Sequence, residues 1–536
     1  MIHDYVIIGI AVLFSVMVLV MIGQKLKVAY PIFLVISGLI ISLVPGMPHV
    51  VIQPELVFLI FLPPILFEAA WFTSWRDFRK WKKTIFSMAF GLVFITSIVV
   101  ALVSSSLIPG VTLAMGFLLG GINSPPDAVA ATSVLKNMKI PKKITSLLEG
   151  ESLINDASSL IVFKFALAAV VTGQFVFTQA LGDFFLMAIG GTAIGLALGF
   201  LFGSLLRIIP SNSNIDTIMT LIVPYIMYVA AEHFHFSGVL AVVAGGLLMS
   251  YNSHCYLSHT SRLQAGSVWS VLIFLMNTII FMLIGLELPI VVKGLSEYTI
   301  GQGIYYSVII GAVIVVTRML YCYGIAYLPY YLFKNNRKNN PKPDWKEPFI
   351  LSFAAMRGVV SLAAALSIPV LLPNGEAFPH RNIILLVTFI IILITLVGQG
   401  LLLSPILKLL KLQEAPLDLP IEKQELLVMK HLKENALSKI NKEYEEAVNV
   451  NNLVNHQKVK LESELRLLVD KSSCLATSVN YKDAVHQSKE VLRNIIHSQR
   501  QELRKMRREN IYDDEVLRVA EMQLDLEETK ITGFAH

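Results

Sequence analysis

Three carboxylates lie in apolar stretches of this chain that are long enough to cross a membrane. Asp127 belongs to the first stretch, and Glu151 and Asp156 belong to the second. A charge at the bilayer centre costs about 3 kcal/mol or more, so acids placed there usually serve a function. The alternative is burial in ion pairs for packing alone. Because a carboxylate can hold a proton or a hard cation such as Na⁺, these acids are candidate ion-binding residues.

Helical spacing gathers further oxygen atoms near Asp156. On a helix, Glu151, Asn155 and Ser159 follow one another at steps of four residues. Ser152 and Asp156 form the adjacent stripe. Carboxylate, hydroxyl and carbonyl oxygens are the ligands that hard cations prefer. This one helix therefore offers a cation both a charged ligand and neutral ligands.

We expect Asp156 to hold the proton or the cation. Ser152 and Asp127 complete the predicted ligands of a transported Na⁺. Glu68 follows Pro63-Pro64 in an earlier stretch and either joins this cation shell or lines an inner cavity. Burial disfavours an empty, charged carboxylate. If only the loaded forms cross between two states of the protein, cation exchanges for proton with no covalent step.

Two apolar stretches contain residues that break helices. One reads Asn123-Ser124-Pro125-Pro126-Asp127, and the other reads Ala354-Ala355-Met356-Arg357-Gly358. We expect the first helix to restart with Ser124 as its cap. Paired interrupted helices point to an inverted-repeat transporter, and the carbonyls freed at the breaks can bind a cation. The competing interpretation is two kinked packing helices.

Arg357 requires an acidic partner at membrane depth. Since the other two acids are assigned to the cation, we predict that Glu151 neutralises it in a structural ion pair. Arg318 is expected to join another internal ion pair, with no partner assigned. Lys164, two turns beyond Asp156, either pairs with an acid or extends to the membrane interface.

Charged residues are scarce over most of the chain. Of its 536 residues 55% are hydrophobic and 15% are charged, against about 25% charged in soluble domains. We therefore expect a transmembrane domain over residues 1–411 and a helical, water-soluble tail over residues 412–536. The net charge of +6 requires no nucleic-acid partner. The three cysteines match no metal or disulfide spacing, and no cofactor is expected.

Hydropathy predicts an all-α membrane protein with about thirteen transmembrane helices. Their expected limits are residues 5–23, 29–46, 53–72, 84–107, 111–135, 147–172, 183–208, 215–233, 236–251, 267–290, 301–330, 348–372 and 382–410. Lysine and arginine gather in alternate loops, as they do on the cytoplasmic side of membranes. We therefore expect the N-terminus outside and the C-terminal tail in the cytoplasm. The first span lacks the basic region of a signal peptide and is expected to be retained.

The tail is predicted to form helices over residues 421–448, 483–510 and 514–529. Arginines make the second of these helices basic: Arg500, Arg504, Arg507 and Arg508. A solvated helix face is the favoured interpretation, and contact with anionic lipid is the alternative. The tail is also a candidate binding region for a regulator.

Three segments resemble motifs of monovalent cation/proton antiporters of the NhaP/NHE type, the sodium/hydrogen exchangers. They are Phe61–Glu68, Gly150–Asp156 and Met356–Leu362. The resemblance covers roughly residues 5–410, and the tail looks like those of bacterial members. It implies an NhaA-like inverted-repeat antiporter fold with two crossed interrupted helices, plus a homodimer in the cell (inner) membrane. It also implies exchange of Na⁺, or of Li⁺ or K⁺, for H⁺, and hence a part in pH homeostasis.

The resemblance carries roles over by position. It makes Asp156 the carboxylate shared by cation and proton. Ser152, Asp127 and Glu68 assist this carboxylate, and Asn155 tunes the site. Because electrogenic relatives carry two aspartates where this chain has Asn155-Asp156, the resemblance implies electroneutral, one-for-one exchange.

The resemblance includes one further match, which concerns packing, and one departure from the family pattern. Glu151 and Arg357 match the family's ion pair between helix bundles. Where the family often has threonine before the aspartate of the first interrupted helix, this chain has Pro126. Proline keeps a carbonyl ligand but offers no hydroxyl, so it cannot make the threonine's hydroxyl contact.

Three alternatives accompany the leading hypothesis of Na⁺/H⁺ exchange. The first is a K⁺-selective cation/proton antiporter. The second is an intramembrane aspartyl protease with Asp127 and Asp156 as its dyad, although Asp156 lacks the Gly-x-Gly-Asp context of such enzymes. The third is a cation channel with a regulatory tail, although no loop of carbonyls resembles a selectivity filter.

Overall fold

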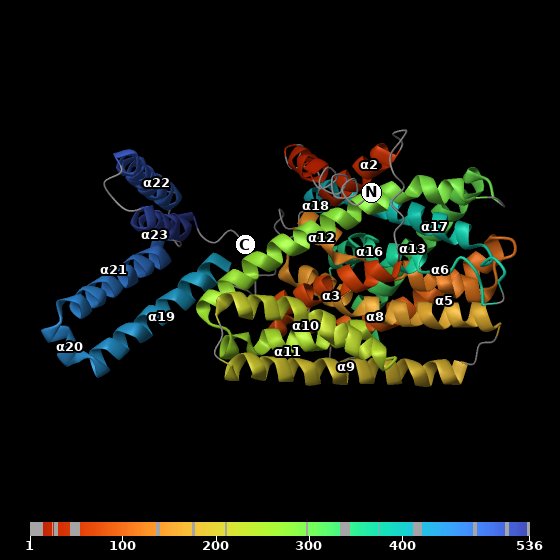
Figure 1. The fold of residues 1–536 in the computed structure, drawn as a ribbon, viewed down its shortest axis with the longest axis horizontal. Coiled ribbons are helices and arrows are strands. Elements are labelled where there is room, and N and C mark those ends of the chain that lie inside the picture. The colour runs from red at the N-terminus through yellow and green to blue at the C-terminus, as the bar shows by residue number, and fades with distance from the viewer. Residues whose placement is uncertain are drawn as a thin grey trace. The chain divides into compact units, whose positions relative to one another are not determined.

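The computed structural model describes residues 14–23, 25, 30–42, 54–135, 140–173, 177–209, 212–295, 298–332, 344–373, 375–410, 421–474, 480–509 and 514–532. Within these ranges the chain is helical, apart from connecting loops and two isolated β-bridges (Figure 1). Residues 5–13 of the predicted first span lie outside the described part. The chain divides into two compact units, residues 1–414 and 415–536; the sequence placed this boundary at 411–412.

The first unit, here called the membrane unit, consists of helices and loops. Its elements are α2 (Tyr30–Ser42), α3 (Pro54–Phe72), α4 (Trp75–Phe86), the π-helix η1 (Ser87–Leu92), α5 (Val93–Leu107), α6 (Leu113–Asn123), α7 (Ala128–Leu135), α8 (Lys142–Thr172), α9 (Phe177–Ile208), α10 (Ser213–His233), α11 (Gly238–Tyr256), α12 (His259–Lys293), α13 (Ile300–Leu332), α15 (Lys346–Phe353), α16 (Val359–Leu366), α17 (Arg381–Leu393), the π-helix η2 (Ile394–Gln399) and α18 (Gly400–Leu410).

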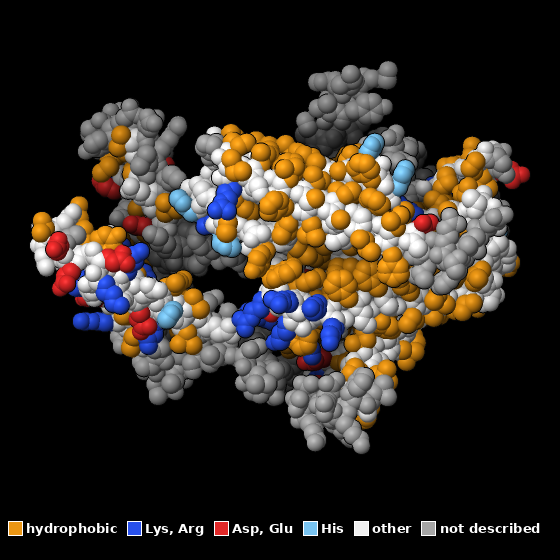
Figure 2. Space-filling model, turned by 90° about the horizontal axis from the view of Figure 1, so that it is seen from below, with side chains coloured by type: hydrophobic (Ala, Val, Ile, Leu, Met, Phe, Trp, Pro, Cys, Tyr) orange, Lys and Arg blue, Asp and Glu red, His pale blue; other side chains and the backbone are white. Residues whose placement is uncertain are grey.

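Seven helical segments of the described chain are long and apolar enough to cross a bilayer, which takes about 20 residues. They are Trp75–Leu107, Lys142–Thr172, Gly182–Ile208, Ser213–His233, His259–Leu286, Ile300–Tyr331 and Arg381–Leu410. Shorter apolar helices cover Phe14–Gly23, Pro31–Ser42, Phe58–Phe72 and Leu113–Asn123. Figure 2 shows a largely hydrophobic surface, with Lys and Arg side chains gathered mostly toward one end of the membrane unit. The chain is therefore a multi-pass helical membrane protein.

One helical segment begins well before the predicted span 84–107. Ser74 accepts a hydrogen bond from the N–H of Asp77 (3.3 Å), which caps α4 at its first residue, Trp75. Five of the twelve residues of α4 are basic, so hydropathy alone misses this amphipathic start. From α4 the helix continues through η1 into α5.

The helices of the membrane unit pack in two groups. In the first group, α9, α10 and α11 pack against one another, α3 packs on α11, and α12 packs along α2. Figure 1 shows α9, α10 and α11 lying side by side. Gly285 of α12 permits the close approach to α2, because a Cβ atom there would overlap the Val35 carbonyl. The second group contains α5, α6, α8, α13, α15 and α17.

The second group contains both of the predicted helix breaks. α6 ends at Asn123 and α7 begins at Ala128, while α15 ends at Phe353 and α16 begins at Val359. The predicted span 348–372 stops early, because α16 ends at Leu366 and a loop follows. These breaks place backbone without helical hydrogen bonds inside the packed unit, where it can line a cavity.

The second unit, the tail, is helical as predicted. Its helices are α19 (Ile421–Glu443), α20 (Glu445–Val450), α21 (Asn452–Cys474), α22 (Asn480–Glu509) and α23 (Asp514–Thr532). α19 packs against α21, and α22 packs against α23. Arg500 on α22 pairs with Asp525 (2.5 Å) and Glu528 (2.6 Å) on α23, and their hydrogen bonds raise the pKa of its guanidinium. This arginine therefore joins two tail helices and does not face solvent alone.

Candidate functional site

The two helix breaks meet inside the second group. The N–H of Asp127 donates a hydrogen bond to the Met356 carbonyl at 2.7 Å, and the two residues form an isolated antiparallel bridge. Four helix ends, those of α6, α7, α15 and α16, are thereby brought together. Because helix ends carry unpaired N–H and C=O groups, this meeting point offers backbone partners for charged side chains.

The restart of the first broken helix differs from the prediction. Ser124 closes α6, since its N–H donates to the Gly120 carbonyl at 2.8 Å. α7 begins only at Ala128, whose N–H donates to the Ser152 hydroxyl of α8 at 3.2 Å. The sequence predicted Ser124 as the cap of the restarting helix. Two successive prolines, however, disfavour helical backbone in the residues that precede them, and this delays the restart. The cap comes from α8, a helix that sequence spacing could not place.

Asp127 lies between the starts of two half-helices. It directly precedes α7, and its carboxylate packs against Gly358, the residue that caps α16. A Cβ atom on residue 358 would overlap the Asp127 carboxylate. A negative charge is favourable at the N-terminal ends of helices, so this position suits an ionised aspartate. Glycine at 358 is what leaves room for it.

Arg357 lies at the opposite ends of the broken helices. Its Nε donates to the carbonyl of Asn123, the last residue of α6, at 3.1 Å, and its Nη1 donates to the Ala355 carbonyl at 2.8 Å. Its backbone N–H donates to Thr395 Oγ1 at 3.1 Å. The side chain is only 1% exposed. The guanidinium therefore satisfies carbonyls at the negative ends of α6 and α15.

The predicted Glu151–Arg357 ion pair is wrong, because Glu151 pairs with Arg318. Nη1 and Nη2 of Arg318 donate to the two carboxylate oxygens at 2.5 and 2.7 Å, and both side chains are 1% exposed. Nη2 of Arg318 also reaches the Leu351 carbonyl at 3.2 Å. The arginine comes from α13, which packs on α15 beside α8. Arg357 instead donates its side-chain hydrogen bonds to backbone carbonyls, and Glu151 acts on it only electrostatically.

Asp156 is nearly buried, with 8% of its surface exposed. No group in the described part of the chain donates a hydrogen bond to its carboxylate. Asp127 lies close enough to act on it electrostatically. Two like charges in one buried place repel each other, so a bound proton or cation relieves this arrangement.

Asn155 connects the Asp156 helix to the first break. Its Nδ2 donates to the Pro126 carbonyl at 3.1 Å, while its Oδ1 is buried without a hydrogen-bond partner in the described part. A buried oxygen without a donor can serve as a neutral ligand for a cation. The Ser152 hydroxyl, which accepts from Ala128, is a second neutral oxygen on the same helix.

The remaining predicted site residue is Glu68. It is half-buried on α3, which packs against α8 and α16. Both predictions for it, cation shell and cavity lining, therefore stay open. Within the described residues, no group of three His, Cys, Asp or Glu side chains could hold a metal ion. A cation at this meeting point would therefore depend on Asp127, Asp156 and neutral oxygens.

Lys164 on α8 pairs with an acid, one of its two expected fates. Its Nζ lies 2.9 Å from Glu232 of α10, and the two side chains are 47% and 34% exposed. Because α8 and α10 belong to different helix groups, this ion pair connects the groups. The sequence could not identify Glu232 as this acid, since only packing brings α8 beside α10.

Comparisons with known proteins identify similar proteins among cation/proton antiporters. A family model described as "Sodium/hydrogen exchanger, transmembrane" matches residues 10–409. A "Sodium, potassium, lithium and rubidium/H(+) antiporter" of Bacillus pumilus is 33% identical over 446 residues, which are 80% of this chain and 65% of that protein. The chain thus spans just under two thirds of this relative's length.

Two further comparisons cover nearly whole proteins. An uncharacterised Na⁺/H⁺ exchanger of Mycobacterium bovis is 28% identical over 97% of this chain and 95% of its own length. The structure of the sodium proton antiporter MjNhaP1 of Methanocaldococcus jannaschii matches with a TM-score of 0.60 and 20% identity. That match covers 77% of this chain and 99% of the archaeal one, and it shows a shared fold.

Proposed function

This chain belongs to the sodium/hydrogen exchanger family, a family of transporters, and we propose that it exchanges Na⁺ for H⁺ by alternating access at Asp156. The observation that carries the proposal is the state of this carboxylate. It is nearly buried, it receives no hydrogen bond from any described group, and it lies near Asp127. Such a carboxylate binds a proton or a cation more favourably than it stays empty.

The exchange follows from competition for one carboxylate. A proton neutralises Asp156 by itself, while a cation neutralises it with help from Asp127 and neutral oxygens. The empty site keeps an uncompensated charge away from water, so it is the least able to pass between the two sides of the membrane. Alternation of the loaded forms then couples entry of one ion to exit of the other.

Neutral ligands complete the proposed cation shell. The Asn155 amide oxygen, the Ser152 hydroxyl and the Pro126 carbonyl all lie on the segments that meet at the break. A carbonyl oxygen has two lone pairs, so the Pro126 carbonyl can accept from Asn155 and still contact a cation. Asn155 thus positions the first break and contributes a ligand. Glu68 borders this shell or the cavity that leads to it.

Relative movement of the two helix groups would expose the site to each side in turn. The helix breaks, with Asp127 and Asp156, belong to one group, while α3 and α9–α12 form the other. The buried Glu151–Arg318 pair holds α8 and α13 of the site group together and is not expected to open. The exposed Lys164–Glu232 pair connects the groups and is cheap to break.

The wider assignments rest on sequence pattern and family resemblance. We propose thirteen transmembrane helices in an NhaA-like fold, a homodimer in the cell membrane, and a part in pH homeostasis. The basic loops favour an N-terminus outside and a tail in the cytoplasm, where the tail would bind a regulator. Asparagine at 155 favours electroneutral exchange. The ions named for the Bacillus pumilus relative include potassium, so a K⁺-selective exchanger is the second candidate.

Proteoliposomes that contain a pH-sensitive dye test this proposal. An outward-directed proton gradient should drive cation entry, so added Na⁺ should make the lumen alkaline. Asp156→Asn should abolish the signal. Each alkali cation is tested in turn, which ranks Na⁺, Li⁺ and K⁺. A membrane potential clamped with valinomycin should leave the rate unchanged if the exchange is electroneutral. Normal exchange by Asp156→Asn would remove the assignment.

A further inference from the structure

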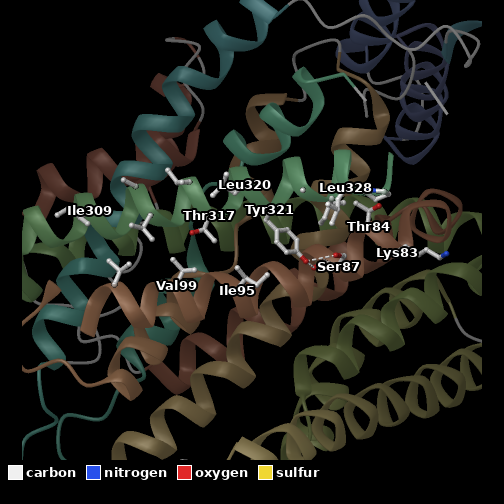
Figure 3. Close-up of a pocket in the computed structure, with 17 residues that line it drawn as sticks. Lys83, Thr84, Ser87, Ile95, Val99, Ile309, Thr317, Leu320, Tyr321 and Leu328 are labelled. Carbon is white, nitrogen blue, oxygen red and sulfur yellow. Dashed lines mark hydrogen bonds between the residues drawn. The ribbon is translucent and has the colours of Figure 1, made fainter. Parts of the chain in front are cut away.

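A groove of about 1190 Å³ runs along the second helix group, between α4–η1–α5 and α13. It is larger than most small-molecule pockets, which hold about 300–1,000 Å³. Figure 3 shows Lys83, Thr84 and Ser87 at one end, Ile309 at the other end, and Tyr321 between them. The groove therefore follows the helices along their length.

The groove is polar at one end and apolar over the rest. Lys83, Thr84, Ser87 and Tyr321 line the first part, with Leu328 beside them. Mostly aliphatic side chains of α5 and α13 line the remainder, together with Thr317. Its residues on the first wall extend from Lys83 to Val103, about 30 Å along a helix, which is the thickness of the hydrocarbon core. An occupant must match this change from polar to apolar along the membrane normal.

A π-helical turn lies at the polar part of the groove. Tyr321 Oη of α13 donates to the Ser87 carbonyl at 2.9 Å and lies 3.1 Å from Ser87 Oγ. Ser87 is the first residue of the π-helix η1, and such bulges often occur at functional sites. These contacts join η1 to α13 at the polar part of the groove.

The polar end of the groove carries an uncompensated positive charge. α4 has five basic residues and one acid, Asp77, and none of these forms an ion pair within the described part of the chain. Lys83 is the basic residue of this set that lines the groove. Basic clusters at a membrane surface attract anionic lipid headgroups. An anionic group at this end of the groove would therefore neutralise Lys83.

We propose that this groove binds one anionic phospholipid, with its phosphate at Lys83 and an acyl chain between α5 and α13. The exposed lining residues Leu320 (71% exposed) and Val316 (54% exposed) contact the chain from α13. The groove opens to the bilayer, so a lipid can enter from the side. The lipid belongs to the leaflet on the side of the basic loops.

Native mass spectrometry of the full chain tests the proposal. The protein is placed in nanodiscs with equal amounts of phosphatidylglycerol and phosphatidylcholine, released in the gas phase, and its retained lipid identified. Lys83→Gln removes the headgroup contact, and Lys82→Gln is its matched control, because Lys82 is basic and adjacent but does not line the groove. Wild type and the control should retain one phosphatidylglycerol. Lys83→Gln should retain at least about fivefold less.

A second pair of variants tests where the acyl chain lies. Val316→Trp fills the groove, while Val308→Trp places the same ring on α13 outside it; the two valines are 54% and 50% exposed. Only the first should lose phosphatidylglycerol. Equal loss in Lys82→Gln and Lys83→Gln, equal retention of phosphatidylcholine, or unchanged retention in Val316→Trp would each overturn the proposal.

A measurement on the unmodified chain covers the case of a misfolded variant. A phosphatidylglycerol that carries a diazirine in its acyl chain is added to the wild-type protein and photolysed, and the labelled peptides are sequenced. Labels should concentrate on residues 84–103 and 309–329. Labels spread evenly over the apolar helices, or placed mainly elsewhere, contradict a specific groove site.

Discussion

Glu151 and Arg318 form a two-pronged ion pair in which both side chains are 1% exposed. The two residues lie 167 positions apart and join α8, which carries Asp156, to α13. Removal of one member of such a buried pair leaves the other charge without compensation. This pair therefore holds in place the helix that carries Asp156.

The first prediction concerns this ion pair. Arg318→Met should destabilise the protein by about 3–5 kcal/mol, because Glu151 is then buried without a partner. The double variant Glu151→Met/Arg318→Met should recover most of this loss, since no charge remains. Lys164→Met is the control, because its exposed pair with Glu232 contributes about 0–1 kcal/mol. Thermal unfolding in detergent measures all three, and an equal effect of Arg318→Met and Lys164→Met would refute the buried role.

The second prediction concerns the space beside Asp127. Gly358→Ala places a methyl group where the Asp127 carboxylate lies, and overpacking of this kind costs about 1–3 kcal/mol. We expect the variant to fold with a displaced carboxylate and to exchange ions at least about tenfold more slowly. Gly266→Ala on α12, which has no atom within 4 Å of its added Cβ, is the control. The dye assay decides; equal rates for both variants would show that the contact is dispensable.

The third prediction concerns the connection between α8 and the first break. Asn155→Ala removes the hydrogen bond to the Pro126 carbonyl and the unpartnered amide oxygen, at a cost of about 1–3 kcal/mol. The half-saturating Na⁺ concentration should rise about fivefold or more. Asn252→Ala, which loses only a bond to Leu248 within its own helix, should leave it unchanged. The idea fails if the two substitutions have the same effect on Na⁺ saturation.

The fourth prediction concerns pH. When proton and cation compete for Asp156, a higher pH removes the competing proton, so less cation is required to fill the site. The half-saturating Na⁺ concentration should fall by about tenfold for each pH unit while protons occupy most sites. It should become constant once the site is deprotonated. Exchange rates measured across pH at several Na⁺ concentrations check this, and a pH-independent half-saturation would contradict competition.

Local sequence chemistry was enough to predict that the chain is helical, that it contains long apolar helices, and where both breaks lie. Proline lacks a backbone N–H and disfavours helix in the residue before it, so Pro125 and Pro126 mark the first break reliably. Gly358 marks the second. Long apolar runs likewise indicated the seven long apolar helices, since a bilayer requires about 20 apolar residues in a row. These features depend on neighbours in the chain.

Long-range pairing could not be predicted in the same way. Arg318 and Arg357 both lie in apolar stretches, and charge balance alone does not say which one faces Glu151. The outcome depends on how α13 packs on α15 and α8, and on the backbone carbonyls that receive Arg357 at the breaks. The prediction of the α7 cap failed for the same reason, because the capping hydroxyl of Ser152 comes from another helix.

The central claim is that proton and alkali cation exclude each other at Asp156, and proton release on cation binding tests it most directly. Purified protein in weakly buffered detergent solution receives NaCl, with choline chloride as the control, and the released protons are counted. We predict about one proton per protein for the wild type and none for Asp156→Asn. Sodium binding without proton release, or equal release by Asp156→Asn, would contradict the account.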